Sequence, residues 1–325
     1  MHPAFSVIFL TTLIGVGQGL FLALYTGQLY SLANLLPAQS PGFYGMGSLV
    51  SLLLLLAGLI ASFFHLGHPE RAWRAATQWR TSWLSREVIA LPVAMGLIFF
   101  YGVFHYFHLT RPLFVISDTL PVDFTLIIGA LATLASFALF LCTAMIYASL
   151  RFIKAWYSPL TVASFLLLGI ASGFMLAAAF SAYLGTSLVA FYGIWAVIAT
   201  LLAMLVRLAM LYRNARFECK VDLQSAIGVH HAQLNQKAQG FMGGSFNTRE
   251  FFHGKSQGFL RLLRYAFLLM VFVLPVMLIL FSYAMESARL PMLAFAIQYL
   301  GLLLERYHFF TEAQHPQNLY YQSVA

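Results

Sequence analysis

Apolar residues occur along this chain in eight runs, each of about 20 residues or more, that are separated by polar links. A transmembrane helix needs about 20 apolar residues. In hydrocarbon a helix satisfies its own backbone hydrogen bonds, whereas an open strand does not. The pattern predicts an all-α integral membrane protein, a bundle of eight transmembrane helices at 5–33, 44–66, 87–108, 123–149, 159–183, 187–212, 262–284 and 290–310.

Composition supports a bilayer rather than water as the solvent of this fold. Hydrophobic residues make up 61% of the 325 residues and charged residues 9%, against about 25% charged in soluble domains. The net charge of +8 does not indicate nucleic-acid binding, because the basic residues sit between the apolar runs. There they would meet anionic headgroups.

The links divide the chain without dividing it into domains, so residues 1–325 are predicted to form one polytopic membrane domain. The sixth link, 213–261, is too long for a plain turn. It is either a disordered loop or a docking surface for a soluble partner. Pro275 inside the seventh run should kink that helix. The chain closes with a short polar tail, 311–325.

Charge asymmetry between the links gives an orientation. An even number of helices puts both termini on one side. Of 18 Lys and Arg residues, only Arg111 and Arg289 fall in links on the opposite side. Cytoplasmic loops carry the excess of Lys and Arg, so both termini, the long loop and the tail are expected to be cytoplasmic. The expected location is a bacterial cytoplasmic (inner) membrane.

Metal cofactors of its own are not expected in this chain. Its two cysteines have no paired spacing that would hold an iron–sulfur cluster or zinc. A b-type haem needs two histidines on different helices at similar depth. His105 and His108 lie at the outer end of the third run without such a partner, while a pair of His65 and His308 on the inner side stays open. No haem and no metal site are predicted.

The stretch 63–88 carries the most informative chemistry. His65 ends the second predicted helix and Glu87 begins the third, so both should lie near the cytoplasmic interface. A quinone needs a hydrogen-bond donor at its carbonyls and a supply of protons, which a histidine with a nearby carboxylate provides. Alternatively, His65 only caps its helix, and Glu87 only pairs with Arg86 or with another Lys or Arg at the headgroups.

Four further residues are candidate quinone contacts. Arg71 and Arg86 could polarise the oxygen that gains charge, and Trp83 lies beside them in the same link. Gln18 lies in the middle of the first helix, where a polar group seeks a partner, so it either packs or contacts quinone. Arg207, near the inner end of the sixth helix, is expected to extend its charge to the interface.

Several short motifs resemble one known family. They are His65-Leu66-Gly67, Pro69, Arg71-Ala72, Leu84-Ser85 with Glu87, Gly17-Gln18 and Arg306. On these residues the chain resembles the membrane-anchor subunits of dimethyl-sulfoxide-reductase-type complexes, the DmsC family. In one departure, Gly301 is followed by Leu302 where the family often has glutamate, and a glutamate appears at Glu305 instead. A role for a carboxylate in the last helix is therefore in doubt.

The resemblance implies a heterotrimeric oxidoreductase. A molybdopterin catalytic subunit handles the substrate, and a four-cluster ferredoxin-like iron–sulfur subunit passes electrons to the anchor. The anchor exchanges them with ubiquinone or menaquinone at a site that carries over to His65 and Glu87, without haem. With the cytoplasmic orientation, the chain is most similar to sulfite-oxidising members, in which electrons run from sulfite to quinone.

Two alternatives remain beside this interpretation. One is a quinol-oxidising anchor of a dimethyl sulfoxide or related reductase. The other, from a different class, is a secondary transporter. A transporter usually shows an internal repeat and charges at mid-membrane. The sequence has no convincing repeat, and away from the helix ends its spans carry almost no ionisable groups.

Overall fold

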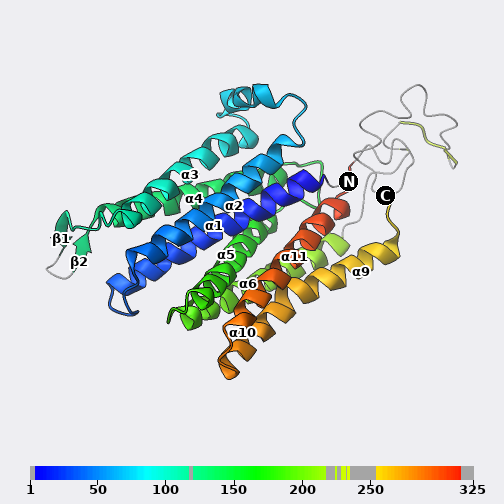
Figure 1. Ribbon diagram of the computed structural model, residues 1–325. Helices are drawn as coiled ribbons and strands as arrows, with labels where there is room; N and C mark the ends of the chain where they lie inside the picture. The colour runs from blue at the N-terminus through cyan, green and yellow to red at the C-terminus, as the bar shows by residue number, and fades with distance from the viewer. Residues whose placement is uncertain are drawn as a thin grey trace.

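The computed structural model describes residues 4–116, 120–216, 224, 228–231, 233–234 and 254–315. Long helices run side by side in a bundle, with a short two-stranded hairpin at one end (Figure 1). The chain is an all-α multi-pass membrane protein. Its long helices are α1 Phe5–Leu32, α2 Pro41–Phe63, α3 Trp83–Tyr106, α4 Phe124–Ala148, α5 Pro159–Tyr183, α6 Val189–Ala215, α9 Gln257–Leu268 with α10 Leu274–Ala284, and α11 Arg289–Glu312.

Within the described residues, seven helical segments are long and apolar enough to cross a bilayer, counting Gln257–Ala284 as one. The eighth predicted span corresponds to α11, which has 24 residues. At about 1.5 Å per residue this length would cross the hydrocarbon. However, α11 carries Gln298, Glu305 and Arg306, and these polar side chains lower its hydropathy. All three are buried within the bundle.

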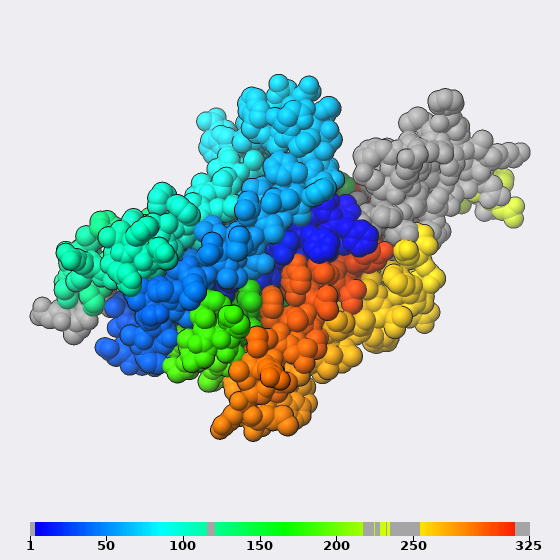
Figure 2. Space-filling view, viewed as in Figure 1, coloured from blue at the N-terminus to red at the C-terminus, as the bar shows by residue number. Residues whose placement is uncertain are grey.

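The link between α2 and α3 differs from the prediction at both ends. Helix α2 ends at Phe63, so His65 lies beyond it. Helix α3 begins at Trp83, where the Ser82 side chain accepts a hydrogen bond from the backbone of Ser85. Glu87 is therefore in the second turn of α3. Between the helices, the 3-10 helix η1 (Pro69–Gln78) stands out from the bundle surface (Figure 2).

Pro275 interrupts the seventh span, as predicted. A π-helical turn, η3 (Leu269–Val273), separates α9 from α10 directly before this proline. Proline has no N–H for the carbonyl four residues earlier, which is that of Val271. The Nε2 of Gln298 on α11 donates to this carbonyl at 3.2 Å and to Thr200 Oγ1 on α6 at 3.1 Å. The break is thus stabilised from a neighbouring helix.

Two segments of the chain add details. The link before α4 forms an antiparallel hairpin of β1 (Phe114–Ile116) and β2 (Leu120–Val122), which the hydropathy pattern did not predict. Most of the long loop predicted at 213–261 and the end of the tail predicted at 311–325 lie outside the described residues.

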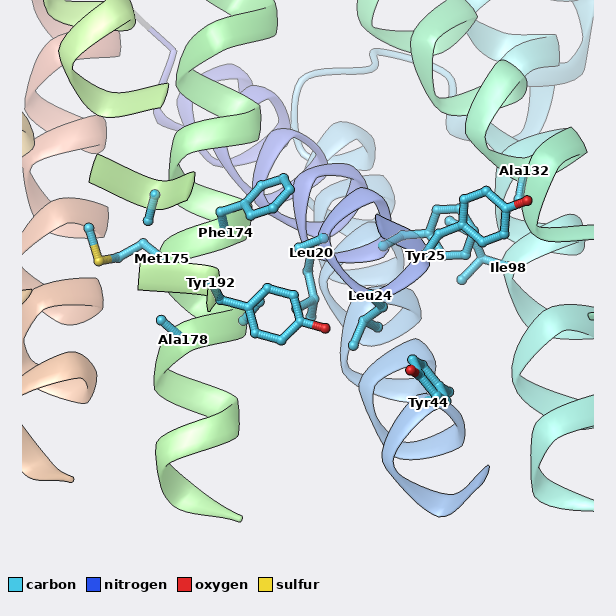
Figure 3. Close-up of a cluster of buried hydrophobic side chains, with 14 of the residues drawn as sticks. Leu20, Leu24, Tyr25, Tyr44, Ile98, Ala132, Phe174, Met175, Ala178 and Tyr192 are labelled. Carbon is cyan, nitrogen blue, oxygen red and sulfur yellow. The ribbon is translucent and has the colours of Figure 1, made fainter. Parts of the chain in front are cut away.

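Helix α1 is the centre of the bundle and packs against α2 and α5. It approaches α5 so closely that a Cβ on Gly173 would lie 1.9 Å from the backbone carbon of Gly19. Small residues allow such approaches between membrane helices. Leu20 and Leu24 of α1 share one buried cluster with Phe174 of α5 and Tyr192 of α6 (Figure 3). Contacts along α1 thus join α2 on one side to α5 on the other.

Candidate functional site

His65 lies two residues beyond the end of α2, in an exposed segment. Within the described part of the chain its imidazole makes no hydrogen bond or ion pair, so no described residue occupies its ring nitrogens. Packing on one side lowers the pKa of His65 below its ordinary value of 6.5, because burial disfavours the charged ring. The ring is therefore an accessible proton-exchanging group at the boundary of the bundle.

Glu87 is 7% exposed and faces α4. Its Oε1 accepts a short hydrogen bond from the Thr143 hydroxyl. A carboxylate in such a position is costly unless it is hydrogen-bonded. Since α4 supplies its partner, the alternative that Glu87 only pairs with Arg86 does not describe the structure.

Arg86 instead holds the link before α3. Its Nε donates to the carbonyl of Trp79 at 2.9 Å and its Nη2 to that of Arg80 at 2.8 Å. The guanidinium lies 4.1 Å from the ring centroid of Trp83, a cation–π distance. Arg71 is exposed and its Nε lies 3.6 Å from Glu70 Oε1. Arg86 and Trp83 are thus brought together, whereas Arg71 lies apart on η1.

Gln18 is buried, at 1% exposed, in the middle of α1. Its Nε2 donates to the carbonyl of Ile14 at 3.2 Å, while its buried Oε1 has no hydrogen-bond partner among the described residues. No hydrogen bond or ion pair in the described part of the chain joins Gln18, His65 and Glu87. Of the six predicted site residues, the structure therefore brings two into contact, Arg86 and Trp83. This pair lies at the end of the bundle where α2 ends and α3 begins.

A buried ionic cluster lies between α6 and the last turns of α11, and the sequence reasoning missed it. Glu305 is shared by two arginines, with Oε1 2.8 Å from Arg207 Nε and Oε2 2.5 Å from Arg306 Nε. Arg207 Nη2 is 3.2 Å from His308 Nδ1, and its Nη1 is 3.6 Å from Glu312 Oε2. We name these five residues the α6–α11 ionic cluster.

One sequence expectation is corrected by this cluster. The expectation that Arg207 extends to the interface is wrong, because Arg207 is 0% exposed and Glu305 and Glu312 neutralise it inside the bundle. The carboxylate of Glu305, which follows the family motif only in part, lies between Arg207 and Arg306. A signal was present, since Glu305, His308 and Glu312 recur at helical spacing on one face of an apolar helix.

His308 belongs to the ionic cluster and is 2% exposed, whereas His65 lies in the exposed link after α2. The possible histidine pair on the inner side therefore has one member already bound to Arg207 and Glu312. At the other end of α3, His105 is buried between the rings of Tyr44 and Tyr101.

The fold and these buried polar groups define a polytopic helical membrane protein, and comparison with known proteins gives its class. Residues 1–311 match the family described as DMSO reductase anchor subunit (DmsC), so the chain belongs to this family and is a membrane-anchor subunit. It is also similar to a subunit of the sulfite dehydrogenase of Allochromatium vinosum, with 65% identity over 325 residues and full coverage of both chains. The family resemblance drawn from residues 17–18, 65–87 and 306 is confirmed.

Proposed function

We propose that this chain is the quinone-reactive anchor of a sulfite-oxidising molybdenum enzyme, and that it passes electrons from an iron–sulfur subunit to the quinone pool. The observation that carries the choice of substrate is the 65% identity, over the full length of both chains, to the Allochromatium vinosum sulfite dehydrogenase subunit. The sulfite site would lie on a partner subunit, because this chain contributes only the membrane part.

The proposed topology has eight spans, with α11 as the last, and cytoplasmic termini. Helix α1 begins and α11 ends at the same end of the bundle (Figure 1). The basic residues of the links gather at that end, and the positive-inside rule makes it cytoplasmic. The iron–sulfur subunit would dock there, with the molybdopterin subunit attached through it.

We place the quinone headgroup at this end because of the chemistry of its residues, an imidazole, a carboxylate and an arginine–tryptophan pair. When bound, the quinone accepts two electrons from the iron–sulfur subunit and takes up two protons. His65, whose ring nitrogens have no protein partner in the described residues, would donate a hydrogen bond and a proton to one carbonyl. Glu87, held by Thr143, would return protons to the imidazole through water. Arg86 and Trp83 would form a cationic and aromatic border.

The test of this site is His65→Ala in the assembled complex. We expect sulfite oxidation with a soluble dye to continue, while electron transfer to a short-chain quinone analogue is largely lost. His68→Ala is the matched control, because His68 lies three residues away and is exposed beside Glu70. Full quinone turnover in the His65 variant would overturn the site, and equal losses in both variants would indicate damage to the link.

The orientation has a separate test. A reporter fused to the C-terminus, active only in the cytoplasm or only in the periplasm, gives the side of the membrane on which α11 ends. Cytoplasmic activity is expected. Periplasmic activity would contradict the docking side and favour the quinol-oxidising reductase anchor instead.

A further inference from the structure

An open cavity lies where α9 begins and α11 ends. Its volume is about 140 Å³. Arg261, Arg264 and Gln257 line it from α9, and Thr311 and Glu312 line it from α11. The cavity adjoins the α6–α11 ionic cluster and is separate from the link that carries His65.

Among the described residues that line this cavity, positive charges outnumber negative ones. Glu312 is held by the cluster, with Oε2 3.6 Å from Arg207 Nη1 and 3.7 Å from His308 Nδ1. Arg261 and Arg264 have no ion pair within the described part of the chain, and the Nε of Arg264 is buried without a hydrogen-bond partner. Two guanidinium groups with no ion pair among the described residues line one cavity beside the single carboxylate of Glu312, and this arrangement favours an anion.

The depth of the cavity indicates what kind of anion. Ser256 caps α9, and the two arginines lie in its first two turns. The outer face of the same turns is apolar, with Leu262 and Tyr265 each 68% exposed. Arginine beside exposed aromatic and aliphatic residues is typical of the headgroup level of a bilayer. An anion bound here would lie beside the acyl chains of the bilayer lipids.

We propose that this cavity binds the phosphate of an anionic phospholipid. Arg261 and Arg264 pair with the phosphate oxygens, Gln257 offers a neutral donor, and the acyl chains lie along Leu262 and Tyr265. The bound lipid would compensate the surplus charge and join α9 to the end of α11. Basic pockets between membrane helices bind anionic headgroups in this way.

The experiment uses the purified complex in detergent, titrated with phosphatidylglycerol or with phosphatidylcholine and followed by native mass spectrometry. Phosphatidylglycerol is expected to bind at least about tenfold more tightly, in line with the strength of charged hydrogen bonds. The double variant Arg261→Gln with Arg264→Gln should lose this preference. Arg289→Gln is the matched control, because Arg289 is exposed at the opposite end of α11. Unchanged helical content shows that each variant is folded.

Three results would overturn the proposal. Equal binding of the two lipids would exclude recognition of the anionic headgroup. Full competition by inorganic phosphate would indicate a site for the free ion. Dissociation of the iron–sulfur subunit from the double variant, with lipid binding unchanged, would indicate that the arginines face an acidic protein surface. None of these results depends on quinone turnover, so this inference can fail while the proposed function stands.

Discussion

The carboxylate of Glu305 is the negative charge that Arg207 and Arg306 share in the bundle. The substitution Glu305→Gln removes this charge and keeps the size of the side chain. In the structure Glu305 and Arg207 are 0% exposed and Arg306 is 4% exposed. Their contacts of 2.8 and 2.5 Å leave one carboxylate between two guanidinium groups. Glu312, at 3.6 Å, then remains the nearest carboxylate to Arg207.

Breaking a buried ion pair from one side costs about 3–5 kcal/mol, because the remaining charge is buried and uncompensated. Since each 1.4 kcal/mol is a factor of ten, the ratio of folded to unfolded protein should fall by about 100-fold or more. The double variant Glu305→Gln with Arg306→Met should recover part of this loss, because it also removes Arg306, whose ion pair among the described residues is with Glu305, and it leaves Arg207 beside Glu312.

The assay is reversible unfolding of the detergent-solubilised chain with increasing fractions of a denaturing detergent, followed by circular dichroism. Glu70→Gln is the control, since the Glu70 side chain is 61% exposed beside Arg71 and its surface pair should be worth less than about 1 kcal/mol. If Glu305→Gln unfolds within about 0.5 kcal/mol of the wild type, the cluster does not stabilise the bundle and the reasoning is wrong.

Three further predictions use the same structure. Gly173→Ala should destabilise the bundle by about 1–3 kcal/mol through overpacking against α1. Gly96→Ala is the control and should not destabilise it, because a Cβ on Gly96 meets nothing within 4 Å. Equal unfolding curves for the two variants would contradict the close packing of Gly173. Thr143→Val should lower the free energy of unfolding by about 1–3 kcal/mol and slow quinone reduction, since it removes the hydrogen-bond partner of buried Glu87. Thr133→Val is the control, because the Thr133 hydroxyl has no partner in the described part of the chain. Similar effects of the two substitutions would count against the Glu87 contact. Because His65 has a lowered pKa, quinone reduction that needs its proton should fall as pH rises through a value below 6.5; a limb at higher pH would assign it to another group.

The amphipathic and apolar patterns were sufficient for most of the fold. The fifth helix is predicted at 159–183 and observed at Pro159–Tyr183, because Ser158 and Pro159 give a clear start. The link after the second helix was harder, since His65 is polar and follows an apolar run without a break. Its helix ends two residues earlier, and a 3-10 helix follows. Local propensity gives weak boundaries where no proline or cap marks them.

The sequence by itself determined that the fold lies in a bilayer, that it is helical and which family it belongs to. Hydropathy and short motifs are properties of neighbouring residues, so they can be read without the fold. Only the tertiary structure decided which polar side chains meet. Glu87 finds Thr143, 56 residues away, and Arg207 finds Glu305 on a helix about a hundred residues later. A buried charge requires a counter-charge or a hydrogen-bond partner. This requirement does not specify which residue is the partner, and the packing of the helices decides it.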